Sequence, residues 1–107
     1  MKNLRKALAV AVAAAALCTV SAAPAQAARG SFAYYVEGWW HGFELTDPED
    51  GRCYDILQGE AHRSTNHTDR LAVLFRGTDC QDGAIVTFLE PGQNAPDHFG
   101  SVKFLVR

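Results

Sequence analysis

The stretch Leu71–Leu89, LAVLFRGTDCQDGAIVTFL, indicates the fold class of this chain more clearly than any other part of its sequence. Its first five residues are apolar and end at Arg76-Gly77, and a second apolar run, Ala84–Leu89, stops at Pro91-Gly92. The connection between the two runs is rich in turn-forming residues. Short apolar runs bounded in this way are typical of β-strands. We therefore predict two consecutive strands, over 71–75 and 84–89.

The same punctuation by glycine, proline, asparagine and aspartate continues on both sides of this stretch. The further strands that we expect cover residues 51–57, 60–64 and 101–106, with a turn over 66–69. In the last run, alternation places Val102, Phe104 and Val106 on one side. Strands spaced about eight to twelve residues apart favour an all-β fold, a small disulfide-stapled Greek-key sandwich.

The core of this domain is predicted from the apolar residues of these short runs, since turn-bounded apolar runs are normally buried on at least one face. Its predicted members are Leu71, Val73, Phe75, Ile85, Phe88, Val102 and Phe104.

The N-terminal part of the chain has the three parts of an export signal. Residues 1–6 hold three basic side chains, Ala7–Val20 is an apolar run, and Ala25–Ala27 supplies the small-x-small pattern of a cleavage site. The apolar run is too short for a stable membrane span. We expect residues 1–27 to be a signal peptide that is removed, which leaves one small secreted domain over residues 28–107.

Cys53 and Cys80 are the only cysteines that remain after this cleavage, because Cys18 lies within the signal. Two cysteines in an exported chain most simply form a disulfide. The pair lacks the C-x-x-C spacing of a redox or metal pair. A domain of about 80 residues is near the lower limit for a self-sufficient core. A Cys53–Cys80 bond is therefore expected to stabilise the domain by about 3–4 kcal/mol.

The mature chain is acidic. It has seven basic and twelve acidic residues, a net charge of −5 with the histidines neutral. Binding to nucleic acid or to an anionic membrane needs clustered positive charge. We therefore expect neither nucleic acid nor a membrane as a partner of the mature domain.

Residues 28–44 form an aromatic-rich N-terminal segment, which holds six of the eleven aromatic residues. Adjacent Trp39 and Trp40 cannot both face inward on a strand, because neighbouring side chains point to opposite faces. Tryptophan and tyrosine are enriched in binding hot spots. The candidate binding residues are therefore Tyr34, Tyr35, Trp39 and Trp40. The alternative is that the outward tryptophan packs beneath a neighbouring loop.

The mature chain shows none of the residue spacings that are typical of catalytic or metal sites. The four histidines, His41, His62, His67 and His98, have neither H-E-x-x-H nor His-x-His spacing, so a zinc site would need ligands gathered from distant turns. The acidic turns lack an EF-hand loop and consist of ordinary turn residues. None of the serines lies in a G-x-S-x-G context. We expect no catalytic residue, no metal site and no cofactor, and hence no enzyme.

From residue 51 onward, several short motifs form a recognisable set. They are Gly51-Arg52-Cys53, Ala61–Asp69 (AHRSTNHTD), Leu71–Phe75 followed by Cys80, Pro91-Gly92 and Phe99–Phe104 (FGSVKF). The set, a little over half of the mature chain, resembles small exported proteins of actinobacteria with a single βγ-crystallin-like domain. The resemblance implies a Greek-key fold, and its members and structural relatives include microbial metalloproteinase inhibitors and killer-toxin-like proteins.

The chain departs from this pattern at two points. Some crystallin-type domains bind calcium through an N-N-x-x-S/T-S stretch, and that stretch is missing here. The reactive-loop residues of the inhibitors also have no matching motif. The resemblance therefore implies a fold, and it assigns neither a calcium site nor an inhibitory loop.

Together, these features predict a secreted, non-enzymatic protein-binding module, such as a protease-inhibitor-like protein, whose partner is another secreted protein. One alternative is an adaptor subunit of a secreted antagonistic complex. The chain is similar to the small middle subunit of umbrella toxin particles in size, export and aromatic N-terminal segment. Another alternative is a directly acting killer-toxin-like protein, which the negative charge disfavours at anionic surfaces.

Overall fold

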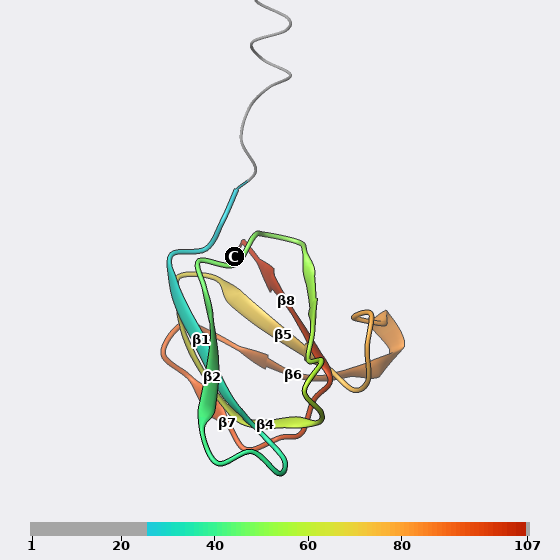
Figure 1. The fold of residues 1–107 in the computed structure, drawn as a ribbon. Coiled ribbons are helices and arrows are strands. Elements are labelled where there is room, and N and C mark those ends of the chain that lie inside the picture. The colour runs from blue at the N-terminus through green and yellow to red at the C-terminus, as the bar shows by residue number, and fades with distance from the viewer. Residues whose placement is uncertain (1–25, 107) are drawn as a thin grey trace, which may run out of the picture.

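The computed structural model describes residues 26–106, which form eight β-strands and one short 3-10 turn, η1 (Figure 1). The predicted signal peptide lies outside the described residues except for its last two positions. The elements are β1 (Gly30–Val36), β2 (Gly42–Thr46), β3 (Cys53–Asp55), β4 (Ala61–Thr68), β5 (Leu71–Phe75), η1 (Asp82–Ala84), β6 (Ile85–Leu89), β7 (Asn94–Ala95) and β8 (Ser101–Leu105). Over residues 26–106 we find no helix with the length and apolar character needed to cross a bilayer.

The strands form two antiparallel four-stranded sheets that face each other (Figure 1). Their orders are β2-β1-β4-β7 and β3-β8-β5-β6. The chain divides into two halves, β1–β4 and β5–β8. In each half the first, second and fourth strands share a sheet, whereas the third strand, β3 or β7, joins the sheet of the other half. The predicted all-β class is therefore confirmed, and the two halves of the domain depend on each other for complete sheets.

The core lies between the two sheets and is built around Phe32 of β1. The Phe32 ring meets Phe99 and Phe104 edge-on, at centroid distances of 6.0 and 5.4 Å. Such edge-to-face contacts add to the gain from burying aromatic surface. Leu74 of β5 and Val102 of β8 close the cluster from the second sheet, and both are fully buried.

Four of the seven predicted core residues are buried, namely Val73, Phe75, Val102 and Phe104, and Leu71 is partly buried. The prediction is wrong for Ile85 and Phe88, which are 42% and 53% exposed. Both lie on β6, an edge strand with a single neighbour, so side chains on its outer face receive little cover. Val106 is also exposed, because β8 ends at Leu105 and the expected alternation stops there.

The predicted turn over residues 66–69 is wrong at its start, because β4 continues through Thr68. Asn66 is fully buried, and its amide group donates to the carbonyl oxygens of Arg70 and Leu89, each at 2.8 Å. Its side-chain oxygen accepts from the backbone N–H of Thr68 at 3.0 Å. A buried polar side chain is tolerated when its hydrogen bonds are satisfied. These bonds allow a strand where the residue types indicate a turn.

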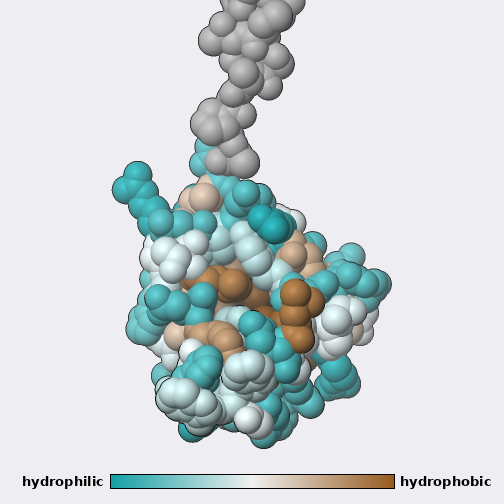
Figure 2. Space-filling model, viewed as in Figure 1, coloured by the Kyte–Doolittle hydropathy of each residue, from teal (hydrophilic) through white to brown (hydrophobic). Residues whose placement is uncertain are grey.

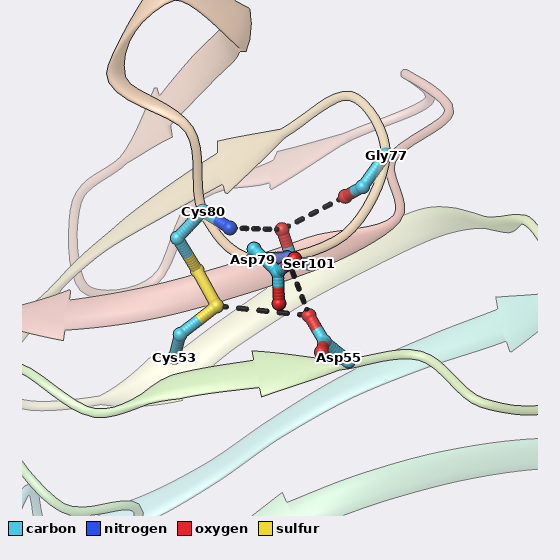
Figure 3. The surroundings of a disulfide bond; sticks show 6 residues. All are labelled: Cys53, Asp55, Gly77, Asp79, Cys80 and Ser101. Carbon is cyan, nitrogen blue, oxygen red and sulfur yellow. Dashed lines mark hydrogen bonds between the residues drawn. A yellow bond between two sulfur atoms is a disulfide. The ribbon is translucent and has the colours of Figure 1, made fainter.

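A second, smaller cluster lies on the outer face of the second sheet, where the predicted Cys53–Cys80 disulfide is present. The bond joins β3 to the loop after β5 and packs against Val73 and Phe75. Figure 3 shows how Ser101 holds this loop: its hydroxyl accepts from the N–H of Cys80 at 3.0 Å and donates to the carbonyl of Gly77 at 2.9 Å. The bond and the serine therefore fix the same loop from two sides.

The start of the domain is tied down by backbone N–H groups that meet carboxylates. The N–H of Arg29 donates to Asp69 at 2.8 Å, and the N–H of Gly30 donates to Asp47 at 2.9 Å. The hydrogen bond from Arg29 holds the pKa of Asp69 below its ordinary value, and the nearby Arg70 guanidinium adds to this effect. The first strand therefore enters the sheet at a defined position.

The first prediction compares two phenylalanines of opposite exposure. Phe104→Ala should lower the free energy of unfolding by about 3–5 kcal/mol, because the side chain is fully buried. Phe88→Ala should cost about 1 kcal/mol or less, because more than half of that side chain is in water. Urea unfolding of both variants measures the difference. Equal losses in the two variants would contradict the described core.

The second prediction concerns the disulfide. A double variant, Cys53→Ala with Cys80→Ala, should lose about 3–4 kcal/mol of stability, because the bond closes a loop of 27 residues in the unfolded chain. Chemical unfolding of the variant and of the wild type gives this number. The native protein should also have an intact mass about two daltons below that of the reduced form, because the bond removes two thiol hydrogens. Two reactive thiols in the native protein would refute the bond.

The third prediction concerns stability at low pH. The pKa of the Asp69 carboxyl is lower in the folded state than in the unfolded state. The ionised carboxylate therefore makes its full contribution to stability at pH values above the ordinary pKa of aspartate, about 3.9. This contribution is lost as the pH falls through the folded-state pKa. In Asp69→Asn the group no longer titrates, so the stability difference from wild type should shrink between pH 6 and pH 2. Unfolding curves across this range test the trend, and a constant difference would contradict it.

Candidate functional site

The connection between β1 and β2, Glu37–His41, carries the two tryptophans and is called the hairpin loop below. The N–H of Trp39 donates to the carbonyl of Val36 at 3.1 Å and closes a turn in which Gly38 has a φ of 84°, a conformation that favours glycine. Trp40 is 92% exposed and Trp39 is 46% exposed. Both tryptophans lie in a loop rather than on a strand, so strand alternation forces neither of them inward.

An aromatic ladder connects the hairpin loop to the core. Its members are Trp40, His41, Trp39, Phe43 and Tyr34. Trp40 meets His41 at a centroid distance of 5.0 Å, and both His41 and Trp39 contact Phe43, at 4.7 and 5.4 Å. Phe43 then stacks on Tyr34 at 5.8 Å. Trp39 and His41 therefore pack on Phe43, and Trp40, at the tip, contacts the ring of its neighbour His41.

The two tyrosines predicted as binding residues point to opposite faces of β1. Tyr34 is buried, and burial raises the pKa of its hydroxyl. It belongs to the core, so the prediction of a binding role for Tyr34 is corrected. Tyr35 is 41% exposed on the outer face, where the Arg63 guanidinium lies 4.4 Å from its ring centre. Of the four predicted binding residues, Tyr35, Trp39 and Trp40 reach the surface.

A groove of about 710 Å³ lies next to the hairpin loop, whose Trp39 donates from Nε1 to the carbonyl of Gln58, between the lining residues Leu57 and Gly59. Its lining includes Ile56, Leu57, Val86, Phe99, Glu60 and His98. Leu57 is 87% exposed. Figure 2 shows that apolar side chains also reach the surface in the middle of the face drawn there. The sequence analysis did not anticipate this groove, because its walls come from loops far apart in the chain.

Near the base of the hairpin loop, Glu37 meets two histidines, His62 and His98. The Nε2 atoms of His62 and His98 lie 3.9 and 3.4 Å from Glu37 Oε1. The two imidazole rings are 5.3 Å apart. The expectation of no metal site rested on residue spacing, and spacing could not reveal this cluster, since its members come from three separate segments. In the sequence, His62 lies within the strand predicted over residues 60–64, and this position gives no indication of the other two members of the cluster.

Several residues considered for chemistry have structural positions instead. Ser64 and Ser101 are fully buried, so neither offers a nucleophile to a substrate. Asp47 and Asp69 accept backbone hydrogen bonds at the start of β1, and Asp50 pairs with Arg70 at 3.0 Å. These carboxylates are occupied within the fold.

We compared the chain with known proteins, and no family model, curated protein or solved structure matches it. Its function is therefore argued from the positions of its own side chains.

Proposed function

We propose that this chain is a secreted, non-enzymatic protein-binding module that contacts its partner through the hairpin loop. The observation that carries the proposal is Trp40, whose side chain is 92% exposed at the tip of a packed aromatic ladder. A tryptophan buried in a partner's pocket is a common source of binding energy. Trp39 and His41 are already packed on Phe43 before binding, which lowers the cost of ordering the loop against a partner.

The surroundings of the loop indicate the chemistry of the partner. Glu37, in the hairpin loop, and Glu44, on β2 just after the loop, are both exposed. The mature chain has a net charge of −5. A partner with an apolar pocket and a basic rim complements this surface. β2, which follows the loop, is the outermost strand of its sheet, so a partner strand can pair with it.

Export and the crystallin-like identity belong to the same proposal. A disulfide is typical of oxidising, extracytoplasmic compartments, which supports secretion after removal of residues 1–27. The exchange of the third strand between the two halves supports a pair of Greek-key units. Within this proposal, an inhibitor places the loop in a protease cleft, whereas an adaptor holds two proteins together.

The fourth prediction tests the hairpin loop with a matched pair of variants. A partner is first isolated by pull-down from culture supernatant with the wild-type domain. Trp40→Ala should then weaken binding of that partner by about 2 kcal/mol or more, close to 30-fold. The melting temperature should stay within a degree or two, because the side chain is in water. The control, Leu57→Ala, removes an equally exposed apolar side chain from the groove.

Unchanged binding of Trp40→Ala would refute the hairpin loop as the binding face. Loss of binding in Leu57→Ala alone would move the binding face to the groove. Inhibition assays against the captured protein, if it is a protease, separate an inhibitor from an adaptor.

A further inference from the structure

The Glu37, His62 and His98 cluster brings three metal-ligating atoms to one point, all within 4.8 Å of one another. The set contains two imidazole nitrogens and one carboxylate oxygen. Imidazole suits zinc, copper and nickel, whereas calcium and magnesium prefer oxygen ligands. Two histidines with one glutamate are a ligand set that zinc uses in open sites with a fourth position for water.

The backbone positions of the three ligands are set by hydrogen bonds between neighbouring segments. Glu37 follows β1, and its N–H donates to the carbonyl of Glu60 at 3.0 Å. His62 lies on β4 opposite Tyr35 of β1 in the sheet register. His98 precedes Phe99, which forms a bridge with Ala61 in the same sheet region. The cluster therefore rests on paired strands rather than on free loops.

The distances between the ligand atoms approach those of a metal-bound set. With metal–ligand bonds of about 2.0–2.1 Å, the ligands of a tetrahedral zinc ion lie about 3.3 Å apart. The His98–Glu37 distance is 3.4 Å and the His62–Glu37 distance is 3.9 Å. Glu37 is the most exposed of the three, so its carboxylate can adjust toward the two histidines, whereas the separation of the two histidine nitrogens, within 4.8 Å, is set by their own side chains. His62, whose side chain is 17% exposed, is the most restrained member.

A fourth residue occupies the position of a supporting partner. Glu60 Oε1 lies 3.7 Å from Nδ1 of His98, on the opposite side of the ring from the nitrogen that faces Glu37. At 3.7 Å the contact is an ion-pair distance, longer than a hydrogen bond. Histidines that bind metals commonly donate their second ring N–H to a carboxylate, and Glu60 is the carboxylate nearest to that ring atom. Glu60 also brings a second negative charge, which with Glu37 offsets the charge of a divalent ion.

The geometry points to a zinc-class metal site in which Glu37, His62 and His98 are the ligands and Glu60 orients His98. Three protein ligands leave one coordination position for water or for a group from another molecule. His98 and Glu60 also line the groove, so the site lies at the rim of the groove. The site joins the base of the hairpin loop, through Glu37, to His62 of β4.

The fifth prediction uses untagged, metal-free protein and zinc sulfate as the probe. Calorimetry and competition with a zinc indicator should give one zinc per chain, with calcium giving no comparable heat. His62→Ala and His98→Ala should each weaken zinc binding by about 100-fold or more, since each removes a ligand. Glu60→Gln should weaken it by about 10-fold and keep one ion per chain. His67→Ala, the matched control, should bind as the wild type does.

A measurement on the unaltered protein protects the test against variants that fail to fold. Zinc added to the wild type should shift the imidazole NMR signals of His62 and His98 and leave those of His67 in place. The site is refuted if no one-to-one binding is seen, if the signals of His62 and His98 do not respond, or if folded His62→Ala and His98→Ala bind zinc like the wild type. These measurements need no partner, so their failure leaves the proposed binding role of the hairpin loop unaffected.

Discussion

Phe32 is the side chain on which the rest of this domain depends, because it joins the two sheets. It comes from β1 and packs against Phe104 of β8 and against Phe99, which lies between β7 and β8. In a domain of about 80 residues there is room for few such contacts. Tyr34 lies on the same face of β1 and extends this packing to Phe43. The position of the hairpin loop therefore follows from the packing of the core.

The sequence allows the prediction of strands that are apolar and clearly bounded, and it fails where local residue types and tertiary contacts disagree. Leu71–Phe75 was correctly predicted to be a strand because turn residues close both of its ends. Asn66 reads as a turn residue, and its amide is satisfied inside the fold by the carbonyl of Arg70 and the distant carbonyl of Leu89. Ile85 and Phe88 read as core residues, yet their strand lies at an edge of its sheet.

The candidate sites show the same contrast between local and long-range information. In the aromatic-rich residues 28–44, strand alternation predicts that one of Trp39 and Trp40 faces outward, and it leaves open whether that side chain packs beneath a loop. The structure places both in a loop, where Trp40 is 92% exposed. Which aromatic stays inside depends on the register of β1 and on the turn at Gly38, and neither can be read from the composition. The cluster of Glu37, His62 and His98 depends entirely on the pairing of β1 with β4 and of Ala61 with Phe99. Long-range pairing of this kind leaves no periodic trace in the sequence.

The exchange of β3 and β7 between the halves makes each sheet depend on strands from both ends of the chain. β3 pairs with β8, the last strand of the domain, and β4 pairs with β7. Because a chain is made from its N-terminus, the first half emerges with β3 unpaired and with no complete sheet of its own. Long-range pairing of this kind is typical of slowly folding domains. The second sheet is complete only once β8, the last strand, has joined both β3 and β5.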